Sequence, residues 1–211
     1  MTPRRRPADA VELTTAAYER QAEEFIRKWG RRPYRCPALL LNLLERAGPR
    51  AALLDLGCGA GQDARFLFAR RHHVVGVDRA WPLLAYARRR SPRVPLVRGD
   101  LRSLPLRPGS FDAIWAAASL MHLPKPQATT LFRTLRTLVP AGGLLAATVA
   151  QGRCAGFLRA GWIPGRYFAR WRKAELERAV RLAGWDVLML KAVANRERRG
   201  RWLALICRRV R

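Results

Sequence analysis

Cysteine is scarce in this chain, and none of it falls in a metal-binding or disulfide pattern. No two cysteines form a C-x-x-C pair, and no histidine lies near one. Zinc knuckles and disulfide frameworks are therefore excluded as organising features, and we expect reduced thiols and no bound metal. The cysteines are Cys36, Cys58, Cys154 and Cys207.

Long apolar runs are also missing. No stretch reaches the length that a helix needs to cross a bilayer. The basic start Arg4-Arg5-Arg6 leads into Pro7 and Ala8 instead of the apolar core of a signal peptide. These absences predict a cytoplasmic protein that has no membrane partner.

Acidic residues are few beside the basic ones. Asp and Glu number 15 and Lys and Arg 41, which gives a formal net charge of +26. A chain this basic binds nucleic acid at least non-specifically, so RNA stays open as a substrate. The densest arginine groups, at 27–35, 88–93 and 196–211, belong to different elements, which is typical of a coding bias on solvated faces. A separate RNA-binding module or an RNA-recognition strand pair is absent.

The length allows one sizeable hydrophobic core and no second domain of ordinary size, since 49% of the 211 residues are hydrophobic. Tyr18, Phe25 and Trp29 recur at helical spacing before Gly30, which predicts an amphipathic helix that packs on the domain. We therefore divide the chain into an N-terminal helical extension, residues 1–35, and one domain, residues 36–211. The sequence does not indicate an oligomeric state.

Strand and helix patterns alternate through the domain and predict its fold class. Such βαβ repetition builds a parallel sheet with right-handed crossovers. The last two apolar runs lack a crossover helix between them and must pair antiparallel. We expect an α/β fold with a doubly wound, mostly parallel, Rossmann-like sheet of about seven strands and an antiparallel C-terminal strand. The predicted strands are 51–56, 73–78, 94–98, 111–116, 143–150, 185–190 and 202–206, and the predicted helices are 38–47, 62–71, 81–90, 127–138 and 173–183.

The most specific motif joins the first of these strands to a glycine turn. Asp55 lies near the end of the strand, and Gly57, Gly59 and Gly61 follow it, with the small residue Cys58 between them. Glycines let the main chain approach a ligand and adopt positive φ. The spacing GxGxG differs from the GxGxxG of dinucleotide sites, and Asp55 would repel a pyrophosphate but attract the cationic sulfonium and amino groups of S-adenosylmethionine. The predicted cofactor is therefore S-adenosylmethionine.

Further acids follow the next two strands, at the edge where open α/β sheets bind ligands. Asp78 ends the second strand and can accept both ribose hydroxyls, with Arg79 beside it. Asp100 and Leu101 follow the third strand, where the adenine amino group needs an acceptor. Ala117, after the fourth strand, would pass beneath the transferred methyl group. These residues complete the predicted cofactor site.

With these motifs the chain resembles the class I S-adenosylmethionine-dependent methyltransferases, in particular those that act on small molecules. The runs Ser110-Phe111-Asp112-Ala113-Ile114-Trp115 and Ser119-Leu120-Met121-His122-Leu123-Pro124 add to this resemblance, which covers roughly residue 18 to the C-terminus. It implies an enzyme that aligns donor and acceptor for an in-line displacement. Such alignment can contribute ~7–11 kcal/mol, so no catalytic triad is required.

The chain departs from the enzymes that methylate nucleic-acid bases. Base amino-methylating enzymes carry a D/N/S-P-P-Y/F motif after the fourth strand, where this chain has Ala116-Ala117-Ala118-Ser119. A Pro-Cys nucleophile for attack on a pyrimidine is also missing, because Cys36-Pro37 has the reverse order. We therefore expect a small-molecule acceptor, with RNA methylation and a non-catalytic cofactor-binding module as the alternatives.

His122 and the stretch 151–171 are the candidate acceptor site. His122 would border the methyl group and has a residue type suited to a general base, unless it only closes its loop by a hydrogen bond to the main chain. The stretch 151–171 mixes glycines with aromatic residues and arginines, which favours a lid that closes over the acceptor. Three of its arginines, Arg153, Arg159 and Arg166, could hold an anionic or planar acceptor. The alternative is an ordinary loop whose aromatic residues cover the core. The predicted pocket walls are Tyr18, Tyr34, Trp162 and Tyr167.

Overall fold

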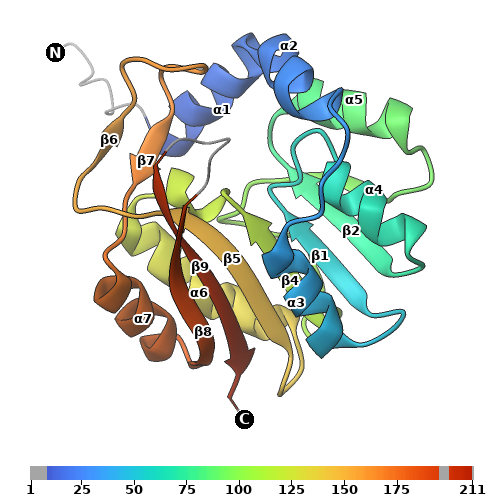
Figure 1. The fold of residues 1–211 in the computed structure, drawn as a ribbon, viewed down its shortest axis with the longest axis vertical. Coiled ribbons are helices and arrows are strands. Elements are labelled where there is room, and N and C mark those ends of the chain that lie inside the picture. Colours follow the sequence, from blue (N-terminus) through green and yellow to red (C-terminus); the bar gives the residue numbers. More distant parts are fainter. Residues whose placement is uncertain (1–8, 195–199, 211) are drawn as a thin grey trace, which may run out of the picture.

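A seven-stranded sheet forms the centre of the computed structural model, which describes residues 9–194 and 200–210 (Figure 1). The strand order is β3-β2-β1-β4-β5-β9-β8. The first five strands in this order are parallel, and β9 is antiparallel to both β5 and β8. The predicted doubly wound sheet with its antiparallel C-terminal strand is confirmed. The strands are β1 (Ala52–Leu56), β2 (His73–Asp78), β3 (Leu96–Arg98), β4 (Ala113–Ala117), β5 (Leu144–Ala150), β8 (Trp185–Ala194) and β9 (Arg201–Arg209).

Helices cover both faces of the sheet, because the central strands bury their side chains on both sides. Leu53 and Leu54 are neighbours in β1, yet they belong to separate core clusters, as the period of two in a strand requires. The helices α3 (Ala38–Ala47) and α4 (Gln62–Ala69) pack on the face of Leu53. The helices α6 (Lys125–Leu138) and α7 (Lys173–Leu182) pack on the face of Leu54.

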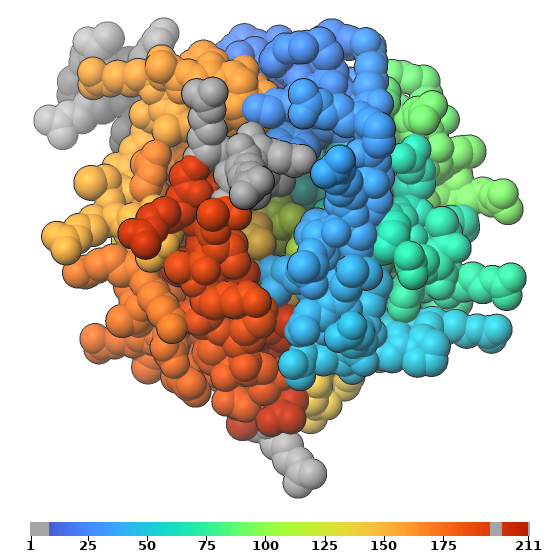
Figure 2. Space-filling model, viewed as in Figure 1, coloured from blue at the N-terminus to red at the C-terminus, as the bar shows by residue number. Residues whose placement is uncertain are grey.

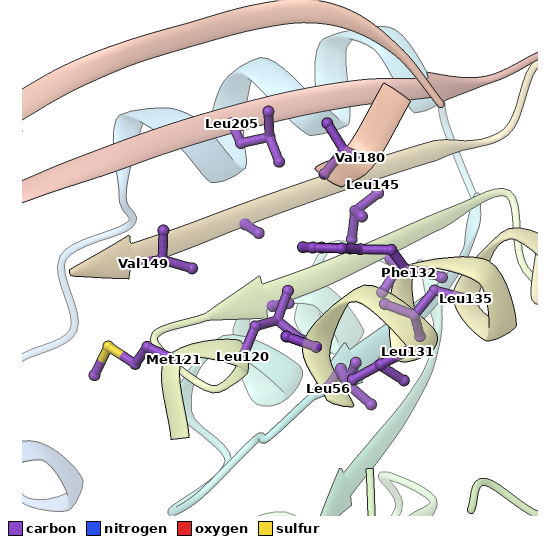
Figure 3. Close-up of a cluster of buried hydrophobic side chains, with 14 of the residues drawn as sticks. Leu56, Leu120, Met121, Leu131, Phe132, Leu135, Leu145, Val149, Val180 and Leu205 are labelled. Atoms are coloured by element: carbon purple, nitrogen blue, oxygen red, sulfur yellow. The ribbon is translucent and has the colours of Figure 1, made fainter. Parts of the chain in front are cut away.

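The larger cluster fills the space between α6, α7 and the sheet. Figure 3 shows Leu131, Phe132 and Leu135 of α6 facing Leu145 of β5, with Val180 of α7 above them. These side chains are almost completely buried. They hold β4 and β5 in place, and the carboxyl ends of these two strands reach the site described below.

The N-terminal helices lie across the end of the sheet toward which the parallel strands point (Figure 1). Helix α1 (Ala10–Arg20) begins after Asp9, whose side chain accepts a backbone N–H of the first turn and caps the helix. Helix α2 (Ala22–Phe25) and a π-helical turn (Ile26–Gly30) continue it and pack against the start of α5 (Trp81–Arg90). The predicted single helix therefore begins earlier than its aromatic spacing indicates and is interrupted at Gln21.

The segment 151–171 contains a small hairpin that the sequence pattern did not predict. Strand β6 (Ala155–Phe157) pairs antiparallel with β7 (Tyr167–Ala169), and Gln151 and Trp171 form a further bridge. Three residues per strand are too few to show a period of two. Trp171 is buried in the larger core cluster, so this end of the segment covers the core as the alternative interpretation expected.

The last two strands are longer than predicted. A register shift between Val187 and Met189 interrupts the alternation of side chains within β8. Residues 195–199, which fall in the predicted connection between the two strands and in the third arginine group, lie outside the described residues. Within the described part of the chain, no helix is long and apolar enough to span a membrane.

Candidate functional site

A cavity of about 720 Å³ opens at the carboxyl ends of β1, β2, β4 and β5. Its walls come from α1, the π-helical turn, the segment 151–171 and the start of β9. Figure 2 shows a hollow in the surface between the N-terminal segment and the C-terminal strands, and both of these border the cavity. The volume lies within the range of small-molecule and cofactor sites.

The glycine turn after β1 borders the cavity at Gly57 and Gly59. The φ angles of Gly57, Gly59 and Gly61 are +80°, +52° and +74°, a region that favours glycine. At two of these positions the protein itself occupies the space of a side chain. A Cβ atom on Gly57 would lie 2.4 Å from the Ser119 Cβ, and one on Gly61 would lie 2.7 Å from the Ala87 Cβ. The sequence predicted that these glycines let a ligand approach the main chain. At Gly57 and Gly61 it is another segment of the protein that approaches.

The turn is fixed to the neighbouring strand β2. The backbone N–H groups of Gly57 and Cys58 both donate to the Val77 carbonyl oxygen, at 2.8 and 3.0 Å. Cys58 is buried and packs against Gly76 of β2, and Gly61 packs against Ala87 of α5. Neither residue lines the cavity. Both contact the protein on the side of the turn that faces away from the cavity.

Asp78 lines the cavity at the end of β2. Its Oδ2 accepts the Gly59 N–H at 2.8 Å, and its Oδ1 accepts the Ala80 N–H at 2.8 Å. Burial raises the pKa of Asp78 above its ordinary value, while these backbone hydrogen bonds oppose the change. A carboxylate oxygen has more than one lone pair, so Asp78 retains capacity to accept ribose hydroxyls while it holds the glycine turn.

Asp55 lies in β1 beneath the glycine turn and is buried, with 2% of its surface exposed. Its Oδ2 has no hydrogen-bond partner among the described residues. Burial first, and then the Asp63 and Asp78 carboxylates, raise the pKa of Asp55 well above its ordinary value. An orphaned carboxylate oxygen beside two further acids fits a cationic ligand. Asp55 does not line the cavity.

Leu101 and Arg79 line the cavity on the predicted adenine side, whereas Asp100 does not. Arg79 Nη1 donates to Asp100 Oδ2 at 3.0 Å, and Arg102 Nη2 donates to the same oxygen at 2.7 Å. Burial alone would raise the pKa of Asp100, but the hydrogen bonds and charges of Arg102 and Arg79 lower it overall. Asp100 therefore sits behind Arg79. To accept an adenine amino group, it would have to give up a contact with arginine.

His122 ends a 3₁₀ turn, Leu120–His122, and lines the cavity. Its Nδ1 lies 2.8 Å from the Tyr167 carbonyl oxygen, and its Nε2 lies 2.9 Å from the Tyr18 hydroxyl. A carbonyl oxygen only accepts, so Nδ1 carries the proton and the Nε2 of the neutral ring accepts the Tyr18 O–H. His122 thus makes the main-chain hydrogen bond of the loop-closing interpretation and also faces the cavity.

Two of the four predicted pocket walls, Tyr18 and Trp162, line the cavity. The Tyr34 side chain does not, contrary to the prediction, because its hydroxyl donates to Asp63 at 2.7 Å and its ring packs on Phe66 of α4. The Tyr167 side chain does not line it either. Its ring packs on Phe157 of β6, 5.5 Å between centroids. Tyr167 contributes to the site through its backbone.

Two further residues, Thr14 and Arg166, line the cavity. The sequence patterns missed Thr14, whereas Arg166 is one of the arginines expected to hold an acceptor. Thr14 lies one turn before Tyr18 on α1, and its Oγ1 accepts the Tyr167 N–H at 2.9 Å. Arg166 is 5% exposed and donates to the Tyr18 hydroxyl at 3.1 Å. The spacing of Thr14 and Tyr18 by four residues on one helix face is the local signal that could have identified Thr14. Its partners come from other parts of the chain.

Residues 53–143 match a family described as a methyltransferase domain. The chain is 39% identical to the trans-aconitate 2-methyltransferase of Methylobacterium nodulans over 107 residues. The aligned residues make up 50% of this chain and 40% of that relative. Over 127 residues the chain is 31% identical to the malonyl-[acyl-carrier protein] O-methyltransferase of Enterobacter lignolyticus, which is 59% of this chain and 48% of that relative. The matched segment spans less than half the length of each relative.

One solved structure with a similar fold is the 1,6-didemethyltoxoflavin-N1-methyltransferase of Burkholderia thailandensis, with bound 1,6-didemethyltoxoflavin and S-adenosylhomocysteine. The TM-score is 0.74 at 19% identity, and the similarity covers 96% of this chain and 88% of that chain. The matched residues 53–143 contain every predicted cofactor residue, from Asp55 to Ala117. Sheet order and the glycine turn beside Asp78 agree with this match, so residues 53–143 are similar to methyltransferase domains and the chain has the fold of the solved S-adenosylmethionine-dependent methyltransferases.

Proposed function

We propose that this protein transfers the methyl group of S-adenosylmethionine to a small-molecule acceptor. One observation carries the proposal: a single cavity joins Gly57, Asp78 and Leu101 on the cofactor side to His122 and Trp162 on the other side. Methyl transfer needs donor and acceptor aligned in one enclosed space. The relative named for trans-aconitate and the structural neighbour named for 1,6-didemethyltoxoflavin support a small-molecule acceptor.

The residues divide the work of binding. When bound, S-adenosylmethionine supplies a methyl group that is already activated on a sulfonium leaving group. Asp78 and the glycine turn hold the ribose and the methionine end. A bound cation would oppose the raised pKa of Asp55, and the ionised carboxylate would then favour the cation over an anionic ligand. Leu101 and Arg79 meet the adenine, and Ala117 forms the floor beneath the methyl group. His122 positions Tyr18, and its use as a general base stays a prediction.

The segment 151–171 acts as the lid over the acceptor in this proposal. Trp162 connects this segment to the N-terminal helices. The centroid of its ring lies 5.7 Å from that of Phe25 and 6.3 Å from that of Trp29. The Lys28 Nζ lies 4.4 Å from the centroid of the Trp162 ring. Gly161 precedes Trp162 at φ +112°, a conformation available to glycine. The four side chains line the cavity and lie outside the seven-stranded sheet, so in this proposal they can separate without disturbing the sheet.

Trp162→Ala is expected to lower kcat/KM for the acceptor roughly five- to a hundredfold, because the aromatic and cation–π contacts of the closed state are worth about 1–3 kcal/mol. The affinity for S-adenosylhomocysteine should change less than about twofold. Steady-state kinetics and calorimetry measure the two effects.

Trp171→Ala is the matched control. Trp171 lies in the same segment as Trp162, but its side chain is buried in the core and only 2% exposed. The substitution should cost about 3–5 kcal/mol of unfolding free energy. If Trp162→Ala destabilises the fold as much as Trp171→Ala, and the segment is fully protected in hydrogen exchange, the lid proposal is wrong.

The function is tested with methyl-labelled S-adenosylmethionine, offered with a small-molecule extract and separately with total RNA over a salt series. The net charge of +26 is the observation that favours RNA as the rival acceptor. We expect label in the small-molecule fraction and RNA binding that weakens steeply with salt and carries no label. Label in RNA would overturn the proposal. Cofactor binding without transfer to either fraction would favour the non-catalytic module instead.

A further inference from the structure

The acceptor side of the cavity contains a buried arginine, Arg166, with 5% of its surface exposed. Its Nε donates to the Ile163 carbonyl oxygen at 2.8 Å, and its Nη1 donates to the Tyr18 hydroxyl at 3.1 Å. The guanidinium carbon lies 4.9 Å from the Trp162 ring centroid and 5.2 Å from that of Phe168. The charge is thus enclosed by aromatic rings and held by two neutral acceptors.

Within residues 9–194 and 200–210, no Asp or Glu side chain forms an ion pair with Arg166. Arg102 is more exposed, yet it pairs with both Asp9 and Asp100. Two neutral acceptors take two of the five N–H donors of a guanidinium. A buried charge without a counter-ion is costly, so the molecule keeps Arg166 here at the expense of folding stability, as functional sites do.

The charges around the cavity have one predominant sign. Among the described residues, Asp78 is the only carboxylate that lines it, and its oxygens already accept the N–H groups of Gly59 and Ala80 on the cofactor side. The cationic residues that line it are Lys28, Arg79, Arg166, Arg170 and Arg201. Apolar and aromatic walls focus such a potential onto a bound ligand. The acceptor side therefore fits an anion better than a neutral or cationic molecule.

We propose, on the basis of the methyl transfer proposed above, that the acceptor carries a carboxylate and that Arg166 binds it together with Tyr18. A guanidinium presents parallel N–H groups that match the two oxygens of a carboxylate. The Tyr18 hydroxyl, which Arg166 and His122 already orient, lies beside this fork. Among the cations that line the cavity, Arg166 is the one that is buried, so the desolvated part of the site carries a single positive charge and matches a monoanion.

Benzoate and its neutral isostere benzamide are suitable probes, each titrated by NMR into the protein saturated with S-adenosylhomocysteine. We expect benzoate to bind at least tenfold more tightly than benzamide. Arg166→Met should weaken benzoate about ten- to a hundredfold, the range of a hydrogen bond to a charged group, and Arg166→Lys should recover part of the loss. Arg159→Met, an exposed position of the same segment outside the cavity wall, should change nothing.

Equal binding of benzoate and benzamide, or benzoate binding that survives Arg166→Met, would overturn the proposal. Phenyl phosphate that binds tenfold more tightly than benzoate would overturn the choice of carboxylate. S-adenosylhomocysteine carries a carboxylate of its own, so its affinity is measured for each variant. A loss there in Arg166→Met would assign Arg166 to the cofactor and also overturn the proposal. Unchanged affinity shows that the variant folds, and failure of the wild type to bind S-adenosylhomocysteine would refute the proposed function instead.

Discussion

Asp78→Ala is expected to weaken the binding of S-adenosylhomocysteine by about 2–4 kcal/mol, or roughly 30- to 1000-fold. We expect no other substitution proposed here to reduce cofactor affinity as much. The carboxylate has two roles that alanine removes together. It offers acceptors for the ribose hydroxyls, and its Oδ2 accepts the Gly59 N–H that fixes the glycine turn. Isothermal titration calorimetry measures the change directly.

Asp78→Asn and His122→Asn are the controls for this result. The asparagine side chain in Asp78→Asn would keep one acceptor oxygen without the charge, so the loss of affinity should be intermediate. His122 contacts Tyr18 and the Tyr167 backbone, so its replacement should leave cofactor affinity within about twofold. A folded Asp78→Ala variant with wild-type affinity would contradict the assignment of the cofactor site.

Gly57→Ala is expected to lower the free energy of unfolding by about 2–5 kcal/mol. The left-handed conformation at φ +80° costs a residue with a Cβ atom about 1–2 kcal/mol. The new Cβ would also lie 2.4 Å from the Ser119 Cβ, and overpacking of this kind costs about 1–3 kcal/mol. Urea unfolding of the variant, followed by circular dichroism, measures the sum.

Gly109→Ala separates the two contributions, because Gly109 has φ +65° and no atom within 4 Å of its Cβ position. Only the conformational cost of about 1–2 kcal/mol is expected there. Adding Ser119→Gly to Gly57→Ala removes the Ser119 Cβ, so the double variant should recover the stability that overpacking costs. A double-mutant cycle measures this recovery. If Gly57→Ala costs no more than Gly109→Ala, the contact between the turn and the loop after β4 is not as described.

The cofactor side of the cavity was predictable in part, because its signals are local: Gly57, Asp78 and Leu101 line the cavity, whereas Asp55 and Asp100 do not. Asp55, Asp78 and Asp100 each fall at or near a strand end that a few neighbouring residues define. The reason for the glycines was not local. Ser119 and Ala87 come from other elements, and only the folded chain brings them to the turn.

The acceptor half could not be predicted to the same extent, because its contacts connect distant segments. Tyr34 follows the N-terminal helices as expected, but its hydrogen bond to Asp63 turns it toward α4. Arg166 is one of three arginines in the stretch 151–171 that the sequence offers for the acceptor, but its burial depends on contacts with α1 that the sequence does not show. Composition does not distinguish a buried arginine from an exposed one.

The two halves of the cavity also differ in when they can form as the chain is synthesised. The contact between Gly59 and Asp78 spans 19 positions, and the nascent chain completes it once β2 has left the ribosome. The contacts of Tyr18 with His122 and Arg166 span 104 and 148 positions, and that of Thr14 with Tyr167 spans 153. Domains fold from the N-terminus during translation. Helix α1 can therefore form its contact with Tyr167 only after β7 has been synthesised. A ribosome-bound chain can therefore form the glycine turn on the proposed cofactor side before it forms the contacts on the proposed acceptor side.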